Sequence, residues 1–129
     1  MALQVELVSP ERILYSGDAD MVICRSEGGD IAFLTGHAPF VGTLGIGVVR
    51  LMGVGGGSEI RAAVHGGFVE VRDNRVIILS DVAELEDQID VERARRAEER
   101  AEEQLRHQTD AADEAALRRA RVRLELAAH

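Results

Sequence analysis

Two patterns of hydrophobic and polar positions divide the chain into a part that predicts strands and a part that predicts helices. Up to about residue 86, short runs rich in Val, Ile and Leu alternate with Gly, Pro, Asp and Asn, which is typical of an antiparallel sandwich or barrel. The segment "FVEVRDNRVIILSD" (68–81) holds two such runs around Asp73 and Asn74, so it predicts a hairpin with a buried second strand. The glycine tract "GVGGGSE" (53–59) predicts another hairpin tip, because adjacent residues without a Cβ resist a fixed helix or strand.

The later residues have the periodicity and the ends of two antiparallel helices. Asp90 is placed to cap the amides of the first helix, and Asp110 is placed to cap the second after the polar break "HQTD" (107–110). The first helix offers mainly Ala94, Ala97 and Ala101 as its inner stripe. Burying an alanine methyl stabilises a helix far less than burying Leu or Val, so we expect the fold of this hairpin to depend on something outside it.

Glycine and charge are distributed differently in the two parts of the chain. All 13 glycines lie between Gly17 and Gly67, and charged residues occupy 18 of the first 86 positions but 20 of the last 43. The predicted fold class is therefore mixed β then α. It consists of an N-terminal antiparallel β sandwich over residues 1–86 and a C-terminal two-helix antiparallel hairpin over residues 87–129.

Composition and charge narrow the class of partner. A chain of 129 residues with 46% hydrophobic residues suits one ordinary domain, or one small domain with an appendage. Its net charge of −8 argues against a nucleic acid or an anionic membrane surface, so another protein is the expected partner. No export signal or membrane-spanning run is present, which predicts attachment to a membrane only through partners. The single cysteine, Cys24, lies in the apolar run "MVICR" and is interpreted as a buried apolar residue.

Residues for enzyme chemistry are missing from the sequence. The chain has no lysine, which excludes a Walker-type phosphate loop in its usual form. The four histidines have no metal-ligand spacing with one another or with Cys24, and no Gly-x-Ser-x-Gly elbow occurs. We therefore expect no catalysis by this chain, no metal and no required cofactor.

Three motifs give the chain a family resemblance. The stretch "SEGGDIAFLTGHAPFVGTLGIGVVRL" (26–51) contains a Gly-His-x-Pro turn at Gly36, His37 and Pro39. It is followed by a Gly-Gly-x-x-Glu-Val hairpin in "VHGGFVEVRDNRVIILSDVAE" (64–84) and by the helix start "IDVERA" (89–94). In this order the motifs resemble the ε subunit of the bacterial F-type ATP synthase, which is similar to the mitochondrial δ subunit. The resemblance covers essentially the whole chain.

The resemblance implies a non-catalytic subunit of the central rotor. Such a subunit has a ten-stranded sandwich that grips the γ subunit and rests on the ring of membrane c subunits, at the cytoplasmic face of the cell membrane. Its hairpin lies folded on the sandwich or extends along γ toward the α and β subunits, where it hinders ATP hydrolysis. A segment that must leave its own domain cannot bury much apolar surface in either state, which agrees with the thin alanine stripe.

The turn near residue 37 is the expected contact with γ or the c ring. Exposed aromatic residues beside a rigid turn suit a protein interface. His37 is interpreted as a hydrogen-bonding residue of the turn rather than as a catalyst. The candidate interface residues are Asp30, Phe33, His37, Pro39 and Phe40.

Some ε subunits that resemble this chain bind ATP in the folded hairpin through an Ile-Asp-x-x-Arg-Ala motif. The resemblance therefore implies ATP as a regulatory ligand, because planar guanidinium groups bind phosphate oxygens in pairs. The alternative is that the arginines form surface pairs with the many glutamates. The candidate ATP-binding residues are Glu84, Ile89, Asp90, Arg93, Ala94, Arg100, Arg119 and Arg123.

Two other functions remain open at this point. A free-standing ATP-sensing module would be a stable monomer without γ. An accessory domain whose helices only tether it would melt at the same temperature with and without ATP.

Overall fold

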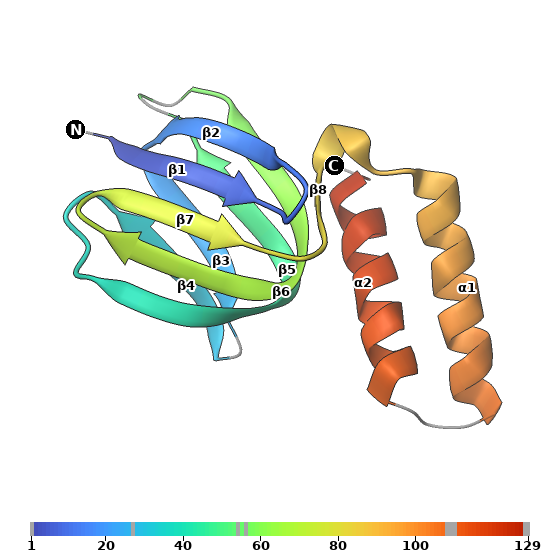
Figure 1. The fold of residues 1–129 in the computed structure, drawn as a ribbon. Helices are drawn as coiled ribbons and strands as arrows, with labels where there is room; N and C mark the ends of the chain where they lie inside the picture. Colours follow the sequence, from blue (N-terminus) through green and yellow to red (C-terminus); the bar gives the residue numbers. More distant parts are fainter. Residues whose placement is uncertain (1, 27, 54, 56, 108–110, 128–129) are drawn as a thin grey trace.

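The computed structural model of the chain describes residues 2–26, 28–53, 55, 57–107 and 111–127. A β sandwich precedes a two-helix hairpin, which confirms the predicted fold class (Figure 1). The strands are β1 (Leu3–Val8), β2 (Ile13–Ala19), β3 (Met21–Ser26), β4 (Gly29–Leu34), β5 (Phe40–Met52), β6 (Glu59–Arg72), β7 (Arg75–Leu79) and β8 (Ala83–Leu85). They are followed by the 3-10 helix η2 (Glu86–Gln88) and the helices α1 (Val91–His107) and α2 (Ala111–Ala127).

The two longest strands, β5 and β6, connect the layers of the sandwich. The strand order is β2-β1-β7-β6-β5-β3-β4, and β8 pairs separately with β6. The end of β6, from Phe68 to Arg72, pairs with β7, whereas its middle, from Ala62 to Val64, pairs with β8. One strand thus contributes to both layers.

The structure differs from the expected sandwich in two respects. The described residues form eight strands rather than ten, because β5 and β6 each continue through both layers as one strand. Counting their two halves separately would give ten. The sheet is also not wholly antiparallel, since β1 and β7 pair in parallel. No tight turn joins these two strands, so hairpin geometry does not set their relative direction.

Two adjacent glycines bend β6 where it passes between the layers. Gly66 and Gly67 have φ values of 85° and 128°, a region that residues with a Cβ rarely adopt. A Cβ built on Gly67 would lie 2.0 Å from the carbonyl oxygen of Leu79 on β7. The hydroxyl of buried Ser80 donates a hydrogen bond of 2.7 Å to the Gly66 carbonyl, which holds the bend from the side of β7.

Turn residues fix the hairpins that the sequence predicts. Asp73 and Asn74 have φ values of 50° and 60°, as a two-residue turn between β6 and β7 requires. The side-chain oxygen of Asn74 accepts a 2.7 Å hydrogen bond from the Gly36 amide, which ties this turn to the turn before β5. At the other predicted tip, Met52 pairs with Glu59, so β5 and β6 form a hairpin around the glycine tract.

The apolar core lies inside the sandwich. Its largest fully buried side chains include Phe33, Leu3, Leu7 and Ile78. Cys24 is 0% exposed in the same cluster, and burial raises the pKa of its thiol to about 12. The interpretation of Cys24 as a buried apolar residue is therefore confirmed.

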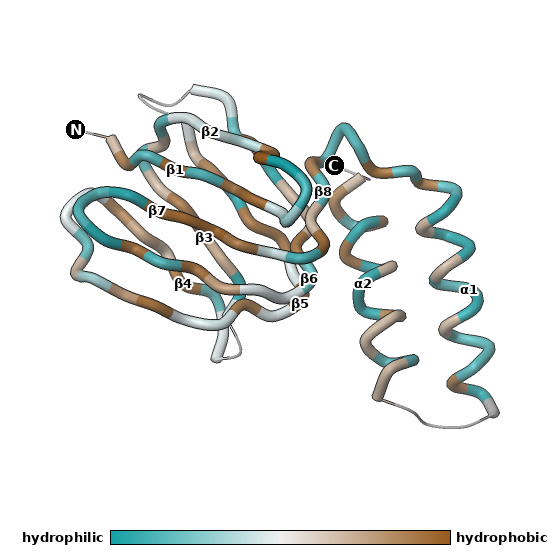
Figure 2. Tube along the Cα trace, in the orientation of Figure 1, coloured by the Kyte–Doolittle hydropathy of each residue, from teal (hydrophilic) through white to brown (hydrophobic). Residues whose placement is uncertain are grey.

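The helical hairpin packs mainly through alanine. The side chains of Ala94, Ala101 and Ala120 are buried, and α1 is mostly hydrophilic along its length (Figure 2). The Arg93 amide donates a hydrogen bond of 3.1 Å to Asp90, which confirms the first cap, whereas Asp110 lies outside the described residues. The helix next to the sandwich is α2, which contacts β5 and β6, and α1 packs on its other side (Figure 1). Neither helix, over its described length, is apolar and long enough to cross a membrane.

The contact beneath Gly67 predicts an unusually large cost for Gly67→Ala. Gly29 has almost the same φ, 126°, but no atom lies within 4 Å of a Cβ built there, so Gly29→Ala serves as the matched control. We expect Gly29→Ala to lower the free energy of unfolding by about 1–3 kcal/mol through backbone strain alone. Gly67→Ala should cost more than about 4 kcal/mol, because β7 must also move. Urea denaturation followed by circular dichroism measures both, and equal costs would show that the contact with β7 contributes nothing.

Candidate functional site

A groove of about 450 Å³ runs between α1 and α2. This volume is within the range of about 300–1,000 Å³ typical of small-molecule sites. The groove begins near β8 and continues toward the connection between the helices. Its lining residues are Glu84, Asp90, Arg93, Ala94, Ala97, Arg100, Ala101, Gln104, Asp113, Ala116, Arg119 and Arg123.

The structure brings the predicted ATP-binding residues together, with one exception. Ile89 does not line the groove. It lies in a separate cavity of about 580 Å³ beside Tyr15, Ile60 and Val91, at the junction of the sandwich and the hairpin. Ile89 precedes the cap residue Asp90 in extended backbone, so its side chain does not follow the helix face that forms the groove.

Sequence reasoning missed the end of the groove farthest from the sandwich. Gln104 on α1 and Asp113 on α2 lie there, and Ala116 completes the wall. A signal was present, because Gln104 follows Arg100 by four residues on the same helix face. Asp113, Ala116 and Arg119 are likewise spaced three apart.

The arginines of the groove differ in their partners. Within the described part of the chain, the guanidinium groups of Arg93, Arg100 and Arg119 have no carboxylate partner, whereas Arg123 forms an ion pair with Glu84. The side chains of Arg123 and Glu84 are 22% and 28% exposed, so this pair is largely shielded. The alternative of ion pairs with carboxylates is therefore right for Arg123 and wrong for the other three.

This arrangement can bind an anion with several oxygens. Arg93 and Arg100 lie two turns apart on α1, about 10 Å along the helix axis. Arg119 faces the same groove from α2. Guanidinium groups are always charged and offer paired donors to phosphate oxygens. Among the described residues, no group of three or more His, Cys, Asp or Glu is placed to hold a metal ion.

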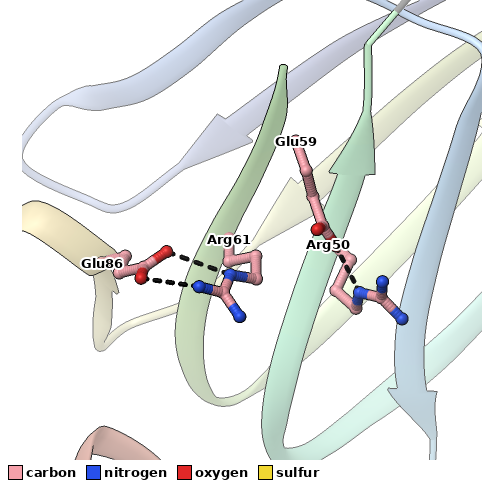
Figure 3. A network of polar contacts seen from close by, with 4 residues as sticks. All are labelled: Arg50, Glu59, Arg61 and Glu86. Atoms are coloured by element: carbon pink, nitrogen blue, oxygen red, sulfur yellow. Dashed lines mark hydrogen bonds and ion pairs between the residues drawn. The ribbon is translucent and has the colours of Figure 1, made fainter. Parts of the chain in front are cut away.

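Polar contacts fasten the segment that joins the two domains. Arg61 on β6 donates two hydrogen bonds to Glu86 of η2, at 3.0 and 2.7 Å (Figure 3). Arg12 donates a 3.2 Å hydrogen bond to Gln88, the last residue of η2. The ion pair between Glu84 and Arg123 then ties this segment to α2. The hairpin is therefore positioned by side chains on both sides of the connection.

The turn expected to form a protein interface is only partly exposed. Asp30 and Pro39 are exposed, and His37 and Phe40 are half-buried. Phe33, however, is 0% exposed, so the expectation of an exposed aromatic ring there is wrong. Its ring packs against His37 and Phe40, at centroid distances of 5.0 and 5.6 Å. The His37 amide donates to the Leu34 carbonyl at 3.0 Å, so His37 does contribute to the turn.

A second candidate interface lies on the outer face of the sandwich and was not found from the sequence. Strand pairing places Phe68, Leu79, Val8 and Ile13 in one row across β6, β7, β1 and β2. Phe68 is 55% exposed, Leu79 48% and Ile13 59%. We name this set the apolar row. The alternation of exposed and buried positions along β6 and β7 could have indicated this surface, since the exposed Phe68 and Leu79 are next to the buried Val69 and Ile78.

Residues 2–86 match the family described as ATP synthase, Delta/Epsilon chain, beta-sandwich domain. Residues 87–128 match the corresponding long alpha-helix domain. The chain belongs to the ATP synthase epsilon family. Members of this family are non-catalytic subunits of the ATP synthase complex.

Curated relatives agree over nearly the whole length. The ATP synthase epsilon chain of Bacillus pumilus is 45% identical over 128 residues, which cover 97% of this chain and 96% of the relative. That of Streptomyces griseus is 46% identical over 126 residues, with 98% and 95% covered. Membership of the epsilon family argues against a free-standing module.

Solved structures place the same fold in the rotary enzyme. A chain of the Euglena gracilis mitochondrial ATP synthase, solved with OSCP, F1 and the c-ring, is similar with a TM-score of 0.84 at 25% identity. The match covers 99% of this chain and 82% of that one. A chain of the Tetrahymena thermophila central stalk and c-ring shares the fold, with a TM-score of 0.56 at 16% identity over 69% of this chain and 70% of that one.

The geometry at β8 predicts that the Glu84–Arg123 pair helps to hold the hairpin on the sandwich. We expect a double-mutant cycle of Glu84→Gln and Arg123→Gln to give a coupling energy of about 1–2 kcal/mol. Hydrogen exchange of the α2 amides at one pH measures it. The control cycle uses Glu92→Gln and Arg95→Gln, an exposed pair on α1, where about 0.3–0.5 kcal/mol is expected. Equal coupling in the two cycles would contradict the fastening role.

Proposed function

We propose that this chain is the central-rotor subunit that connects γ to the c ring and inhibits ATP hydrolysis through a hairpin held down by ATP. The observation that carries the proposal is the groove between α1 and α2, which Arg93, Arg100 and Arg119 line without a carboxylate partner among the residues that the structure describes. A thin alanine interface joins the same two helices. A ligand of opposite charge would supply the stabilisation that the hairpin lacks.

The sandwich offers two separate surfaces for two rotor partners. We assign the apolar row to γ, because a contiguous set of exposed apolar side chains suits the centre of a protein interface. We assign the turn containing Asp30, His37 and Pro39 to the c ring. The hydrogen bond between Gly36 and Asn74 places that turn next to the start of β7, and Leu79 of the apolar row is the last residue of β7. The two surfaces therefore lie near opposite ends of this strand. Binding to membrane subunits in this way would keep the chain peripheral, at the cytoplasmic face of the membrane.

The hairpin is built to leave the sandwich. Only α2 packs extensively on the strands, and α1 packs on the side of α2 that faces away from the sandwich (Figure 1). Polar contacts fasten the hairpin's connection to the sandwich, and such contacts can be exchanged for water or for another protein. In the released state the hairpin would extend toward the α and β subunits and hinder hydrolysis.

ATP would bind with its phosphates between the two helices. Arg93, Arg100 and Arg119 would contact phosphate oxygens, and Asp113 at the far end would repel them, which confines the phosphates to the inner part of the groove. Asp90 and Glu84 would lie at the nucleoside end. A ligand that binds only the docked hairpin stabilises it by about 2.7 kcal/mol at a concentration one hundred times Kd. High ATP would therefore oppose inhibition, and low ATP would permit it.

We expect calorimetric titration of the isolated chain with ATP to show binding that requires the groove arginines. The Arg93→Ala, Arg119→Ala variant should weaken binding at least about 100-fold, since each lost charge-assisted contact contributes about 1.5–3 kcal/mol. The matched control, Arg96→Ala with Arg118→Ala, removes one exposed arginine from each helix that does not line the groove. No heat at millimolar ATP would leave the helices as a tether without a nucleotide role. Equal loss in both variants would point to nonspecific attraction of charge.

For the apolar row, we expect Phe68→Ser with Leu79→Ser to raise the Kd for γ at least about tenfold, because both side chains lose apolar burial. Both residues are about half-exposed, so the isolated chain should remain folded. Glu70→Gln, on the same outer face of β6, is the control and should leave the Kd nearly unchanged. An unchanged Kd in the double variant would show that γ binds elsewhere.

A further inference from the structure

A half-buried histidine with shielded ring nitrogens lies at the junction of the sandwich and the hairpin. His65 belongs to β6, directly before the bend at Gly66, and its amide donates a 3.0 Å hydrogen bond to the Val82 carbonyl. Both ring nitrogens are shielded from water, and neither has a hydrogen-bond partner among the described residues. A buried polar group without a partner is costly, so its persistence calls for an explanation.

The charged groups around His65 are predominantly positive. Arg119 and Arg123 of α2 act on the ring, and the strand residue opposite on β5 is Ile46, which has no charge. On β8 the charged side chain is Glu84, and its carboxylate is already paired with Arg123. A proton on His65 would therefore add a third cation next to two arginines.

The groove behind these arginines is also predominantly positive, and its remaining carboxylate, Asp113, lies at the end farthest from the sandwich. From α1, Arg93 and Arg100 face the same groove as Arg119 and Arg123, and Asp90 is engaged in capping the helix. From η2, Glu86 is held by Arg61. The carboxylates near the junction are thus committed to other partners in the docked state.

We propose that His65 is a proton-sensitive release for the helical hairpin: protonation of its ring beneath α2 repels Arg119 and Arg123 and favours the undocked state. The inference rests on the proposed mobility of the hairpin. Undocking exposes the ring to water and separates it from both arginines. Acidification would then act in the same direction as a fall in ATP.

The titration of the His65 ring supports release of the hairpin at low pH. Burial first, then the charges of Arg123 and Arg119, lower the pKa of His65 from 6.5 to about 4. The docked state therefore prefers the neutral ring, and the undocked state binds the proton at an ordinary pKa. The stabilisation of docking is complete above about pH 6.5 and is lost progressively as the pH falls toward 4.

Nuclear magnetic resonance of the full chain without nucleotide tests the proposal. The ring protons of His65 report its pKa, and the α2 amides report docking between pH 7.5 and pH 5. The full pKa difference corresponds to about a 30-fold change in the docking equilibrium at pH 5, and water around the half-buried ring reduces it, so we expect about a tenfold loss.

Three variants separate His65 from the other titrating groups. His65→Phe keeps a ring of similar size without nitrogens, so its hairpin should remain docked at pH 5. His65→Gln repeats the test if Phe does not fit. His37→Gln removes a histidine in the distant turn and should retain the acid response.

The proposal fails if the His65 ring titrates near pH 6.5 while the α2 amides do not move. It also fails if either His65 variant releases its hairpin as readily as the unaltered chain. In both cases ATP binding and inhibition of hydrolysis remain separately measurable, because this titration uses neither nucleotide nor other subunits. The wild-type ring titration decides the matter even if a variant does not fold.

Discussion

The bend at Gly66 and Gly67 is the constraint on which the arrangement of the two domains depends. Before the bend, β6 pairs with β8 and forms part of the surface under α2. After it, the same strand pairs with β7 and presents Phe68 on the outer face of the sandwich. The hydrogen bond from Ser80 and the close approach of the Leu79 carbonyl leave no space for a side chain at Gly67. One strand thus fixes the position of the apolar row relative to the surface on which the hairpin docks.

The two domains are held together by different kinds of interaction. Inside the sandwich, branched and aromatic side chains form one continuous apolar core. Between α1 and α2 the buried side chains are mostly alanine, and the connection to the sandwich includes the polar pairs Arg61–Glu86 and Glu84–Arg123. Exposing buried apolar side chains to water costs much free energy, whereas exchanging polar contacts at a surface for contacts with water costs little. The sandwich is therefore suited to permanent assembly, and the hairpin to a reversible position.

The sequence was sufficient for the features that depend on local chemistry. Asp73 and Asn74 predicted their turn, and Asp90 predicted its cap. The family resemblance indicated the arginines that line the groove. Features that depend on long-range pairing could not be predicted in this way. The parallel pairing of β1 with β7 joins distant segments, and the apolar row exists only after four strands are aligned. Phe33 illustrates the same limit, because its position near a turn gave no indication of which side of β4 faces the core.

The burial of Cys24 has a practical consequence for the study of hairpin motion. Its thiol is the only one in the chain, is fully enclosed by the core, and has a pKa raised to about 12. Maleimides react with the thiolate, which at neutral pH is almost absent from such a site. A cysteine introduced on the surface of α1 and another on the sandwich would therefore be modified selectively without removal of the native residue. Fluorophores attached there would report the distance between the domains in a chain with an unaltered core.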